Sequence, residues 1–421
     1  MQSPTPFTLT DCQARALHAL TETHDNIFLT GSAGSGKSYL IKEFLKTKDK
    51  KAFPVLASTG SAAVLIGGRT FHSFFGLGIM QGGFDNIVDK ALKNKQVLKR
   101  LKSINSFVLD EVSMIPGDAL RAAETICGYA RQKPQLPWGG ARVIAVGDFA
   151  QLPPVSPGNS EKPWAFLDPV WEKTGFTACV LKTLVRSQDE EFLQVLNSVR
   201  QGLVTPAVSQ YLNERTFEDV QDTRDIPYFF PLRKQSEDLN TKRLSDIPND
   251  LYEYATTYQG VAHAVEALKK NLFLPEVLRL KKTAFVMIRV NDPSYKFVNG
   301  SLGHIIDIDE QAEKTVLHIQ LLNKRIVEIE KMHFSVLDAE GEPIATAENF
   351  PLTLAYATTI HKSQGMTVDR MCVDLRRLWE PGQAYVALSR LRSGAGLNLL
   401  GWSPSSIQVD KQVTRFYEGL E

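Results

Sequence analysis

Short apolar runs alternate with segments of helical period along roughly the first 180 residues. Each run is followed by a polar residue or a turn, and the four clearest runs are Ile27–Leu29, Val55–Ala57, Phe107–Leu109 and Val143–Val146. Buried strands that alternate with helices are typical of a parallel sheet covered on both faces. Residues 78–102, rich first in glycine and then in lysine, interrupt the pattern and predict a small excursion from the sheet.

The chain changes character twice after this first region. Glu190–Arg200 has a helical pattern and Tyr228–Phe230 is typical of a strand, whereas apolar and polar residues alternate with a period of two through residues 284–333. Short alternating strands joined by turns predict a small β-barrel. The α/β pattern returns after Pro351, with Met371–Val373 as a strand. We therefore expect an α/β protein with a small inserted barrel.

Charge is balanced over the 421 residues, with 48 basic and 47 acidic side chains, so any site for a polyanion must be local. No apolar run approaches the roughly 18 residues that span a bilayer, and the N-terminus lacks the pattern of a secretory leader. We expect a cytoplasmic protein without membrane contact. The cysteines are too widely spaced for a Cys-x-x-Cys zinc site or a disulfide framework: Cys12, Cys127, Cys179 and Cys372.

A phosphate-binding loop is the most specific motif. GSAGSGKS fits the pattern G-x-x-x-x-G-K-[ST], follows the first apolar run and precedes a helical segment. Backbone N–H groups of such a loop surround phosphate oxygens at a helix N-terminus, where negative charge is favoured. Lys37 would reach the β- and γ-phosphates of ATP, and Ser38 would ligate Mg²⁺. The predicted nucleotide contacts are Gly31, Ser32, Ala33, Gly34, Ser35, Gly36, Lys37 and Ser38.

Two carboxylates and an amide follow later strands. Asp110 comes directly after the third apolar run, where a carboxylate can hold Mg²⁺ through water. Glu111 is then placed to orient and deprotonate the attacking water. Gln151 follows the fourth run, where its amide can sense the γ-phosphate. Two carboxylates in series favour hydrolysis over mere nucleotide binding.

The order of the motifs resembles the superfamily-one DNA helicases of the 5′-to-3′ branch, and most of all the petite-integration-frequency (Pif) helicases, which are related to the RecD family. Motifs in matching order span almost the whole chain. Trp138 is a departure, because the family usually has phenylalanine there. The segments that carry the resemblance are GSAGSGKS (Gly31–Ser38), ASTGSAA (Ala57–Ala63), TFHSFFGLG (Thr70–Gly78), LDEVSM (Leu109–Met114), GDFAQLPPV (Gly147–Val155), LVRSQDEEF (Leu184–Phe192), TTIHKSQGMT (Thr358–Thr367) and GQAYVALSR (Gly382–Arg390).

The resemblance implies two RecA-like P-loop motor domains with ATP between them and an inserted SH3-like barrel. The first motor domain would cover residues 1–180, with a strand-separating insertion at about 78–102; the second would cover 181–280 and 351–421, around a barrel at 281–350. It further implies a monomeric enzyme that uses ATP and Mg²⁺ to move 5′-to-3′ on single-stranded DNA and to unwind forked or partial-duplex DNA. Roles in DNA repair, recombination and telomere maintenance would follow.

Individual residues also take roles from the resemblance. Gln13 matches the glutamine that reads adenine, and Gln364 and Gly365 match a nucleotide-facing segment of the second motor domain. Arg186 and Arg390 match the contacts of that domain with the γ-phosphate, where arginine neutralises transition-state charge. On spacing alone, these two arginines also fit surface positions at helix starts.

Strand binding needs phosphate contacts together with base stacking. On the first motor domain Thr59 and Gly60 follow the second apolar run, and His72, Ser73 and Phe74 add polar groups and a ring. The corresponding set on the second motor domain is Thr358, His361 and Lys362. Two of these aromatic or imidazole side chains also fit a structural role instead of strand binding. Phe74 fits packing in the core, and His361 fits an interior position.

Other functions share parts of this pattern. A nucleotide kinase or small-molecule ATPase would have the same phosphate loop but would not need Arg390 or the segment Thr358–Thr367. A non-catalytic module that uses ATP as a clamp would not need Glu111. A RecD-like or RNA-active translocase would keep all the motifs, and no residue of the sequence reports recognition of a 2′-hydroxyl.

Overall fold

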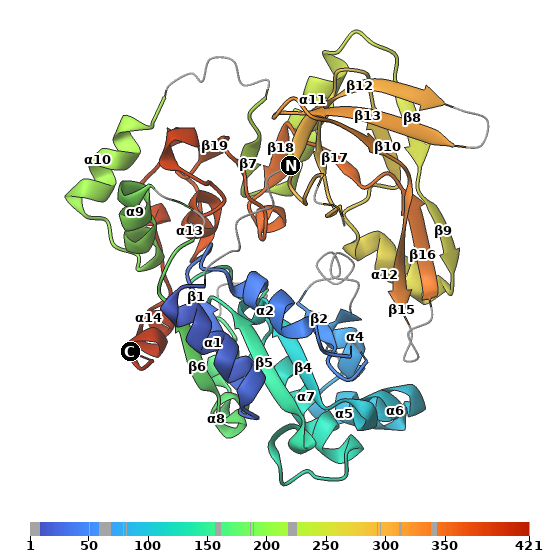
Figure 1. Ribbon diagram of the computed structural model, residues 1–421, viewed down its shortest axis with the longest axis vertical. Helices are drawn as coiled ribbons and strands as arrows, with labels where there is room; N and C mark the ends of the chain where they lie inside the picture. Colours follow the sequence, from blue (N-terminus) through green and yellow to red (C-terminus); the bar gives the residue numbers. More distant parts are fainter. Residues whose placement is uncertain are drawn as a thin grey trace. The chain divides into compact units, whose positions relative to one another are not determined.

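A computed structural model describes residues 9–420, apart from 50, 59–68, 79, 81, 156–160, 186, 188, 218–224, 293, 295, 311–313 and 338–342. The chain forms two compact units (Figure 1). The first unit contains residues 1–59, 68–188 and 410–421, and the second contains 60–67 and 189–409. The last twelve residues, expected in the second motor domain, thus group with the first unit.

The first unit is built on a parallel six-stranded sheet in the order β3-β2-β4-β5-β1-β6 (Figure 1). All four apolar runs of the sequence form strands of this sheet, which confirms their prediction. Parallel pairing brings the carboxyl ends of the strands to one edge. The strand bounds are β1 (Ile27–Gly31), β2 (Val55–Ala57), β3 (Arg69–Thr70), β4 (Ser106–Asp110), β5 (Arg142–Gly147) and β6 (Thr177–Leu181).

Alternating side chains of each strand pack on opposite faces of this sheet. On β1, Ile27 and Leu29 join the core beneath α1 and α2, whereas Phe28 contacts Trp171 of α8 and Phe416 of α14, with ring centroids 5.1 and 5.9 Å away. Helices therefore cover both faces, as the continuous apolar runs predict. The helices are α1 (Asp11–Glu22), α2 (Lys37–Leu45), α4 (Phe71–Phe75), α5 (Phe84–Lys93), α6 (Lys95–Ser103), α7 (Gly117–Ala130), α8 (Pro169–Thr174) and α14 (Lys411–Glu418), with 3₁₀ turns at Val112–Met114, Pro137–Gly140 and Ala165–Leu167.

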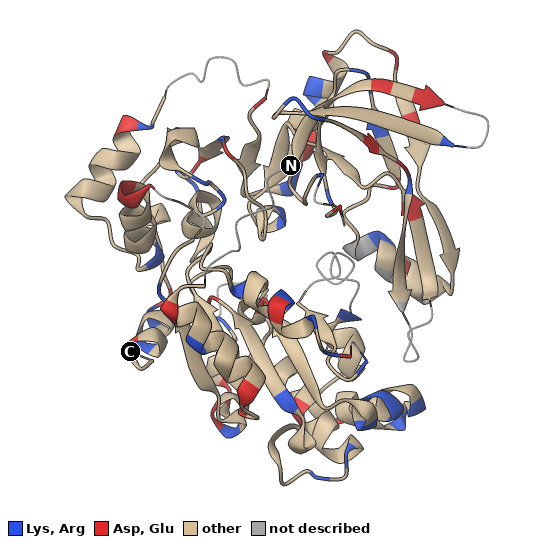
Figure 2. Cartoon of the chain, viewed as in Figure 1, with Lys and Arg blue, Asp and Glu red and all other residues tan. Residues whose placement is uncertain are grey.

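The excursion at residues 78–102 consists mainly of the helix pair α5 and α6. Asn94 caps α6 by accepting hydrogen bonds from the backbone N–H groups of Gln96 and Val97. Basic residues are frequent along this pair (Figure 2), and Lys95, Lys99 and Lys102 are exposed. The apolar side chains of the pair face inward, so the lysines form a solvated outer face.

Trp138, the departure from the family pattern, is a core residue. Its indole N–H donates to the hydroxyl of Thr174 over 2.9 Å, and its ring lies edge-on to Phe107 of β4 at 5.2 Å. Its backbone N–H and carbonyl are bound by the side chains of Glu124 and Cys127 of α7. The larger indole thus ties α7 and α8 to the sheet.

The second unit contains a parallel four-stranded sheet in the order β18-β7-β19-β20 (Figure 1). The predicted helix Glu190–Arg200 and the predicted strands at Tyr228–Phe230 and Met371–Val373 are confirmed. The elements are α9 (Glu190–Arg200), α10 (Pro206–Glu214), β7 (Tyr228–Phe230), α11 (Arg233–Ser245), β18 (Ala357–Thr359), β19 (Met371–Asp374), α13 (Gln383–Leu388) and β20 (Leu397–Gly401), with 3₁₀ turns at His361–Ser363, Gly394–Gly396 and Pro404–Ser406.

The region of alternating residues forms an antiparallel five-stranded sheet in the order β14-β13-β12-β11-β17. Its inward side chains, among them Ile305, Leu317 and Ile319, share one core with the smaller sheets β15-β16-β9 and β10-β8. The bounds are β8 (Tyr252–Ala255), β9 (Thr257–Gly260), α12 (Ala262–Asn271), β10 (Val277–Leu280), β11 (Phe285–Ile288), β12 (Leu302–Glu310), β13 (Thr315–Leu321), β14 (Ile326–Ile329), β15 (Met332–Leu337), β16 (Pro343–Asn349) and β17 (Leu352–Leu354). Across the described ranges, none of the helices combines the length and apolarity needed to cross a membrane.

Candidate nucleotide-binding site

The phosphate loop joins the end of β1 to the start of α2. The Lys37 ammonium donates to the carbonyl oxygens of Gly31 and Ser32 over 2.7 and 3.2 Å, which places the cation inside the loop. Gly36 caps α2 with φ 92°, and no side chain caps the helix. The loop thus leads directly into the N-terminus of a helix, the position at which backbone N–H groups bind anions.

Gln13 binds this loop from α1. Its Nε2 donates to the carbonyl oxygen of Ser35 over 2.9 Å, and its Oε1 accepts from the backbone N–H of Thr10 over 3.0 Å. The second bond belongs to a capping box that starts α1, so one buried side chain both begins the helix and touches the loop. A Cβ on Gly36 would lie 2.6 Å from Gln13 Nε2, so only glycine fits there without displacement.

Asp110 and Glu111 lie at the same edge of the sheet. Asp110 ends β4, two strands from β1 in the sheet, and its Oδ1 accepts from the Glu111 backbone N–H over 3.0 Å. Burial, followed by the charge of Glu111, raises the pKa of the Asp110 carboxyl to about 7, against the Glu111 N–H and the Lys37 charge, which lower it. Glu111 has φ 52°, a left-handed conformation that is uncommon outside glycine and typical of functional turns.

Gln151 closes a tight turn after β5. Its backbone N–H donates to the carbonyl oxygen of Asp148 over 3.0 Å, while the Asp148 carboxylate accepts from the backbone N–H of Ala150 over 3.1 Å. Asp148 is fully buried and Gln151 is 5 % exposed. Since β5 lies beside β1 and Thr30 pairs with Gly147, the turn and the phosphate loop leave neighbouring strands.

Tyr417 of α14 is a residue at this edge that the sequence analysis missed. Its hydroxyl contacts Asp148, Phe149 and Thr30. No motif marks Tyr417, because its position depends on the packing of the last helix against the first unit.

The proposed Mg²⁺ donors fit that ion chemically. Asp110 supplies a half-buried carboxylate whose negative charge is unfavourable beside Glu111, and Ser38 supplies a hydroxyl in the first turn of α2. Mg²⁺ usually takes one or two protein oxygens and completes its shell with water and phosphate. Among the described residues, no group of three or more His, Cys, Asp and Glu side chains could hold a metal by itself.

Predicted nucleotide contacts also lie in the second unit. Arg390 is 2 % exposed, and its guanidinium donates to the carbonyl oxygen of Val386 over 2.8 Å and to the hydroxyl of Ser389 over 2.7 Å. Gln364 follows the 3₁₀ turn at His361–Ser363, and Gly365 has φ 78°. Arg186 lies outside the described residues.

The strand contacts predicted for the first motor domain are described only in part. Thr59 and Gly60 lie outside the described residues. Ser73 is exposed on α4, and His72 is half-buried; desolvation lowers the pKa of the His72 imidazole, although the charge of Asp118 opposes this. His72 is therefore neutral near physiological pH and can take part in hydrogen bonds.

Phe74 does not offer a surface for base stacking in this conformation. Its side chain is 2 % exposed, its ring meets Phe75 at a centroid distance of 5.2 Å, and the Arg100 guanidinium covers it at 5.0 Å. Arg100 also donates to the Phe74 carbonyl oxygen over 2.6 Å. The ring is apolar and fills the core beneath α4, so core packing, the alternative reading, describes it.

The set predicted on the second motor domain is accessible. Thr358 is half-buried on β18, and both His361 and Lys362 are exposed on the 3₁₀ turn that follows. Neighbouring protein atoms partly desolvate both charged groups and lower the pKa of each. For Lys362 the charges of Arg233 and Arg289 lower the pKa further, which shows that cations gather here.

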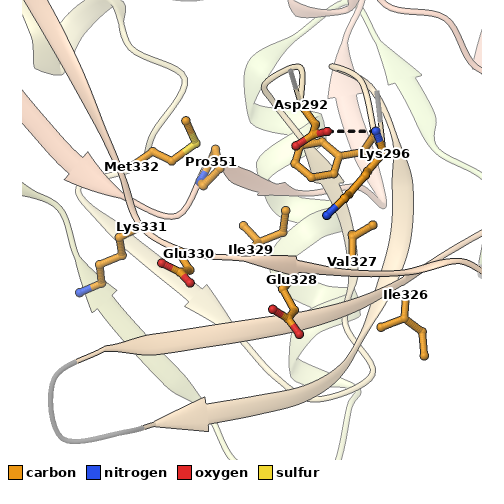
Figure 3. A pocket seen from close by; sticks show the side chains of 11 residues that line it. Asp292, Lys296, Ile326, Val327, Glu328, Ile329, Glu330, Lys331, Met332 and Pro351 are labelled. Carbon is orange, nitrogen blue, oxygen red and sulfur yellow. Dashed lines mark hydrogen bonds between the residues drawn. The ribbon is translucent and has the colours of Figure 1, made fainter. Parts of the chain in front are cut away.

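A cavity of about 580 Å³ lies beside β14 in the second unit (Figure 3). Its walls carry charges of both signs: Asp292, Glu328 and Glu330 against Lys296 and Lys331. None of the residues predicted to bind nucleotide or DNA lines it. Mixed charge does not favour a polyanion, so this cavity is a poor candidate for a strand channel.

The sequence is similar to a family of helicases. The family model for PIF1-like helicases matches residues 8–209 of this chain. The chain is 48% identical to the ATP-dependent DNA helicase Pif1 of Bdellovibrio bacteriovorus over 97% of this chain and 91% of that protein. It is 32% identical to the ATP-dependent DNA helicase PIF1 of Xenopus laevis over 94% of this chain, but it spans only 62% of that longer protein.

Solved structures share the fold. The Pif1 helicase of Candida albicans superposes with a TM-score of 0.81 and 31% identity, covering 99% of this chain and 100% of that one. Bacteroides Pif1 in complex with ADP-AlF₄ gives a TM-score of 0.83 with 26% identity over 98% of this chain and 97% of that one. The same protein with ADP-AlF₃ and single-stranded DNA gives 0.68 with 26% identity over the same shares. The α/β fold with parallel sheets is therefore that of these structures.

Proposed function

We propose that this chain, which belongs to the PIF1-like helicase family, is an ATP-dependent DNA helicase that moves 5′-to-3′ on single-stranded DNA and unwinds duplex. The observation that carries the proposal is the grouping at one sheet edge of the Lys37 ammonium, the Asp110–Glu111 pair and Gln151. The names of the relatives support the helicase, ATP-binding and DNA-binding parts of this function. Direction and unwinding rest on the family resemblance.

We assign the two parallel sheets to two RecA-like motor domains and the antiparallel sheet β14-β13-β12-β11-β17 to an SH3-like insertion. Parallel strands with helical crossovers support the first assignment, and short antiparallel strands around one core support the second. The proposed boundaries are 1–180, 181–280, 281–350 and 351–421, although residues 181–188 and 410–421 group with the first unit.

In the proposed mechanism, backbone N–H groups of the loop and the Lys37 ammonium bind the β- and γ-phosphates. Gln13 donates to the loop carbonyl of Ser35. From the family resemblance, we expect it to contact the adenine. Ser38 and Asp110 would hold Mg²⁺, which would supply positive charge to the phosphate oxygens. Gln151 senses the γ-phosphate from the turn after β5.

Glu111 orients the attacking water and takes its proton, because it lies next to Asp110 and is held in a left-handed turn at the sheet edge. Arg186 and Arg390 enter the proposal through the family resemblance: we expect their guanidinium groups to stabilise charge on the transferring phosphoryl group during turnover. Gln364 and Gly365 contribute to the same nucleotide from the second motor domain.

For the strand, we propose phosphate contacts from Thr59, Gly60, His72 and Ser73 on the first motor domain and from Thr358, His361 and Lys362 on the second. Phe74 supports α4 from the core. Single-stranded and forked DNA are the expected partners. We expect a monomer to hydrolyse ATP. One similar solved structure, by contrast, concerns DNA unwinding at forked duplex DNA by two coordinating Pif1 helicases.

The test measures ATP hydrolysis with and without a single-stranded oligonucleotide, and strand separation on duplexes with a 5′ or a 3′ tail. We expect hydrolysis to rise on adding DNA and unwinding only with the 5′ tail. Lys37→Ala should abolish both activities, whereas Lys42→Ala, an exposed lysine on the same helix, should leave them unchanged. DNA-independent hydrolysis would refute the helicase proposal, and stimulation by RNA alone would redirect it to an RNA translocase.

A further inference from the structure

The last helix of the chain is anchored to the first unit by two kinds of contact. Asp410 caps α14 by accepting from the backbone N–H of Gln412 over 2.9 Å, and its second carboxylate oxygen accepts from the Trp164 indole over 2.8 Å. Phe416 stacks on Phe166 with 4.4 Å between ring centroids. These contacts hold α14 in one register on the sheet, so Tyr417 has a defined position.

The Tyr417 hydroxyl contacts residues at the carboxyl ends of two neighbouring strands, β1 and β5. It donates to Oδ1 of Asp148 over 3.0 Å, accepts from the backbone N–H of Phe149 over 2.9 Å, and lies 2.9 Å from Oγ1 of Thr30. Thr30 and Asp148 are fully buried. One proton and two lone pairs match these three partners, since the Thr30 hydroxyl can donate to the remaining lone pair.

The two strand ends that Tyr417 contacts lead into the segments with the proposed catalytic groups. Thr30 comes directly before Gly31, where the phosphate loop begins, and Asp148 begins the turn that ends at Gln151. The Asp148 carboxylate also accepts from the Ala150 N–H, so the hydroxyl contacts the group that shapes the turn. Because a catalytic group must be held within about 0.5 Å of its productive place, such a support affects turnover.

We propose that Tyr417 is a positioning residue for ATP hydrolysis, which fixes the Gln151 turn against the strand that leads into the phosphate loop. The inference rests on the proposed function. It makes α14, the segment that follows the second motor domain in the chain, part of the nucleotide site of the first. Loss of the hydroxyl removes one donor from the buried Asp148 carboxylate and an acceptor from the Phe149 N–H, so we expect the turn to shift.

The test uses Tyr417→Phe in the full chain, since this change removes only the oxygen atom. We expect kcat for DNA-stimulated ATP hydrolysis to fall about tenfold, and affinity for ADP–aluminium fluoride to fall by a similar factor. Affinity for ADP should stay within about twofold, because the loop and Lys37 are untouched. Rates are expressed per nucleotide-binding site, so that unfolded protein does not enter them.

Two further variants separate positioning from stability. Val413→Ala removes a buried side chain from the same helix without touching the hydroxyl. We expect it to lower the melting temperature and to leave kcat within about twofold. In a Gln151→Ala background, Tyr417→Phe should change the affinity for ADP–aluminium fluoride by less than about twofold, because the group it positions is gone.

A Tyr417→Phe protein with wild-type kcat and wild-type affinity for ADP–aluminium fluoride would overturn the inference. Equal losses in the presence and absence of the Gln151 side chain would overturn it as well, because Tyr417 would then act elsewhere. Both results differ from failure of the proposed function, in which the unmodified protein itself would lack DNA-stimulated hydrolysis.

Discussion

Gly36→Ala tests the contact between Gln13 and the phosphate loop. Gly36 has φ 92°, and a left-handed alanine costs about 1–2 kcal/mol. The new Cβ would also lie 2.6 Å from Gln13 Nε2, which must give up its bond to the Ser35 carbonyl. An unsatisfied buried carbonyl costs roughly 1–3 kcal/mol. We therefore expect the free energy of unfolding to fall by about 2–5 kcal/mol.

Gly175→Ala is the matched control. Gly175 ends α8 with φ 65°, and its Cβ would meet no heavy atom within 4 Å. In this variant the free energy of unfolding should fall only by the cost of the left-handed backbone conformation, about 1–2 kcal/mol. The free energy of unfolding of both variants is measured in urea. The difference between their losses gives the cost of the contact between the new Cβ and Gln13, about 1–3 kcal/mol. Binding of a fluorescent ADP analogue should weaken about tenfold for Gly36→Ala and stay unchanged for Gly175→Ala, since every 1.4 kcal/mol is tenfold in affinity.

Equal losses of stability in the two variants, together with normal ADP binding by Gly36→Ala, would contradict a structural role for the Gln13–Ser35 contact. That result would mean that Gln13 moves aside without cost, and that its bond to Ser35 does not shape the loop. A large loss of stability with normal ADP binding would separate the two roles and restrict Gln13 to the capping of α1.

Three further changes test other parts of the molecule. Glu111→Gln should lower kcat about 100-fold or more while ADP affinity stays unchanged in titrations, and undiminished turnover would exclude a general base there. Trp138→Phe should lower the free energy of unfolding in urea by about 1–3 kcal/mol, because it leaves a cavity and removes the hydrogen bond to Thr174. Trp402, which is half-exposed in the second unit, provides the control, and Trp402→Phe should lose less stability. Burial raises the pKa of the Cys12 thiol, but hydrogen bonds with Thr10 and Thr183 outweigh this and lower it to about 7, whereas burial raises the pKa of Cys127 to about 12. Iodoacetamide at pH 8 should therefore label Cys12 first by mass spectrometry, more slowly as the pH falls through 7, and early labelling of Cys127 would contradict this.

Much of the first unit followed from local patterns. Four apolar runs became β1, β2, β4 and β5, because a strand buried on both faces must be apolar throughout. The phosphate loop was equally visible, since its function needs consecutive residues with a fixed spacing. Asp110, Glu111 and Gln151 could be placed from their positions after predicted strands, because parallel strands end at one edge.

Contacts between distant segments depended on packing. The sequence pattern marks Phe74 as aromatic but does not show that Arg100 and Phe75 enclose it. Likewise nothing local shows that α14 returns to the first unit, or that the Tyr417 hydroxyl meets Asp148. An amphipathic helix must bury one face, but many surfaces satisfy that need equally well. The choice among them depends on shape and hydrogen bonding summed over the assembled fold, which no short window of sequence contains.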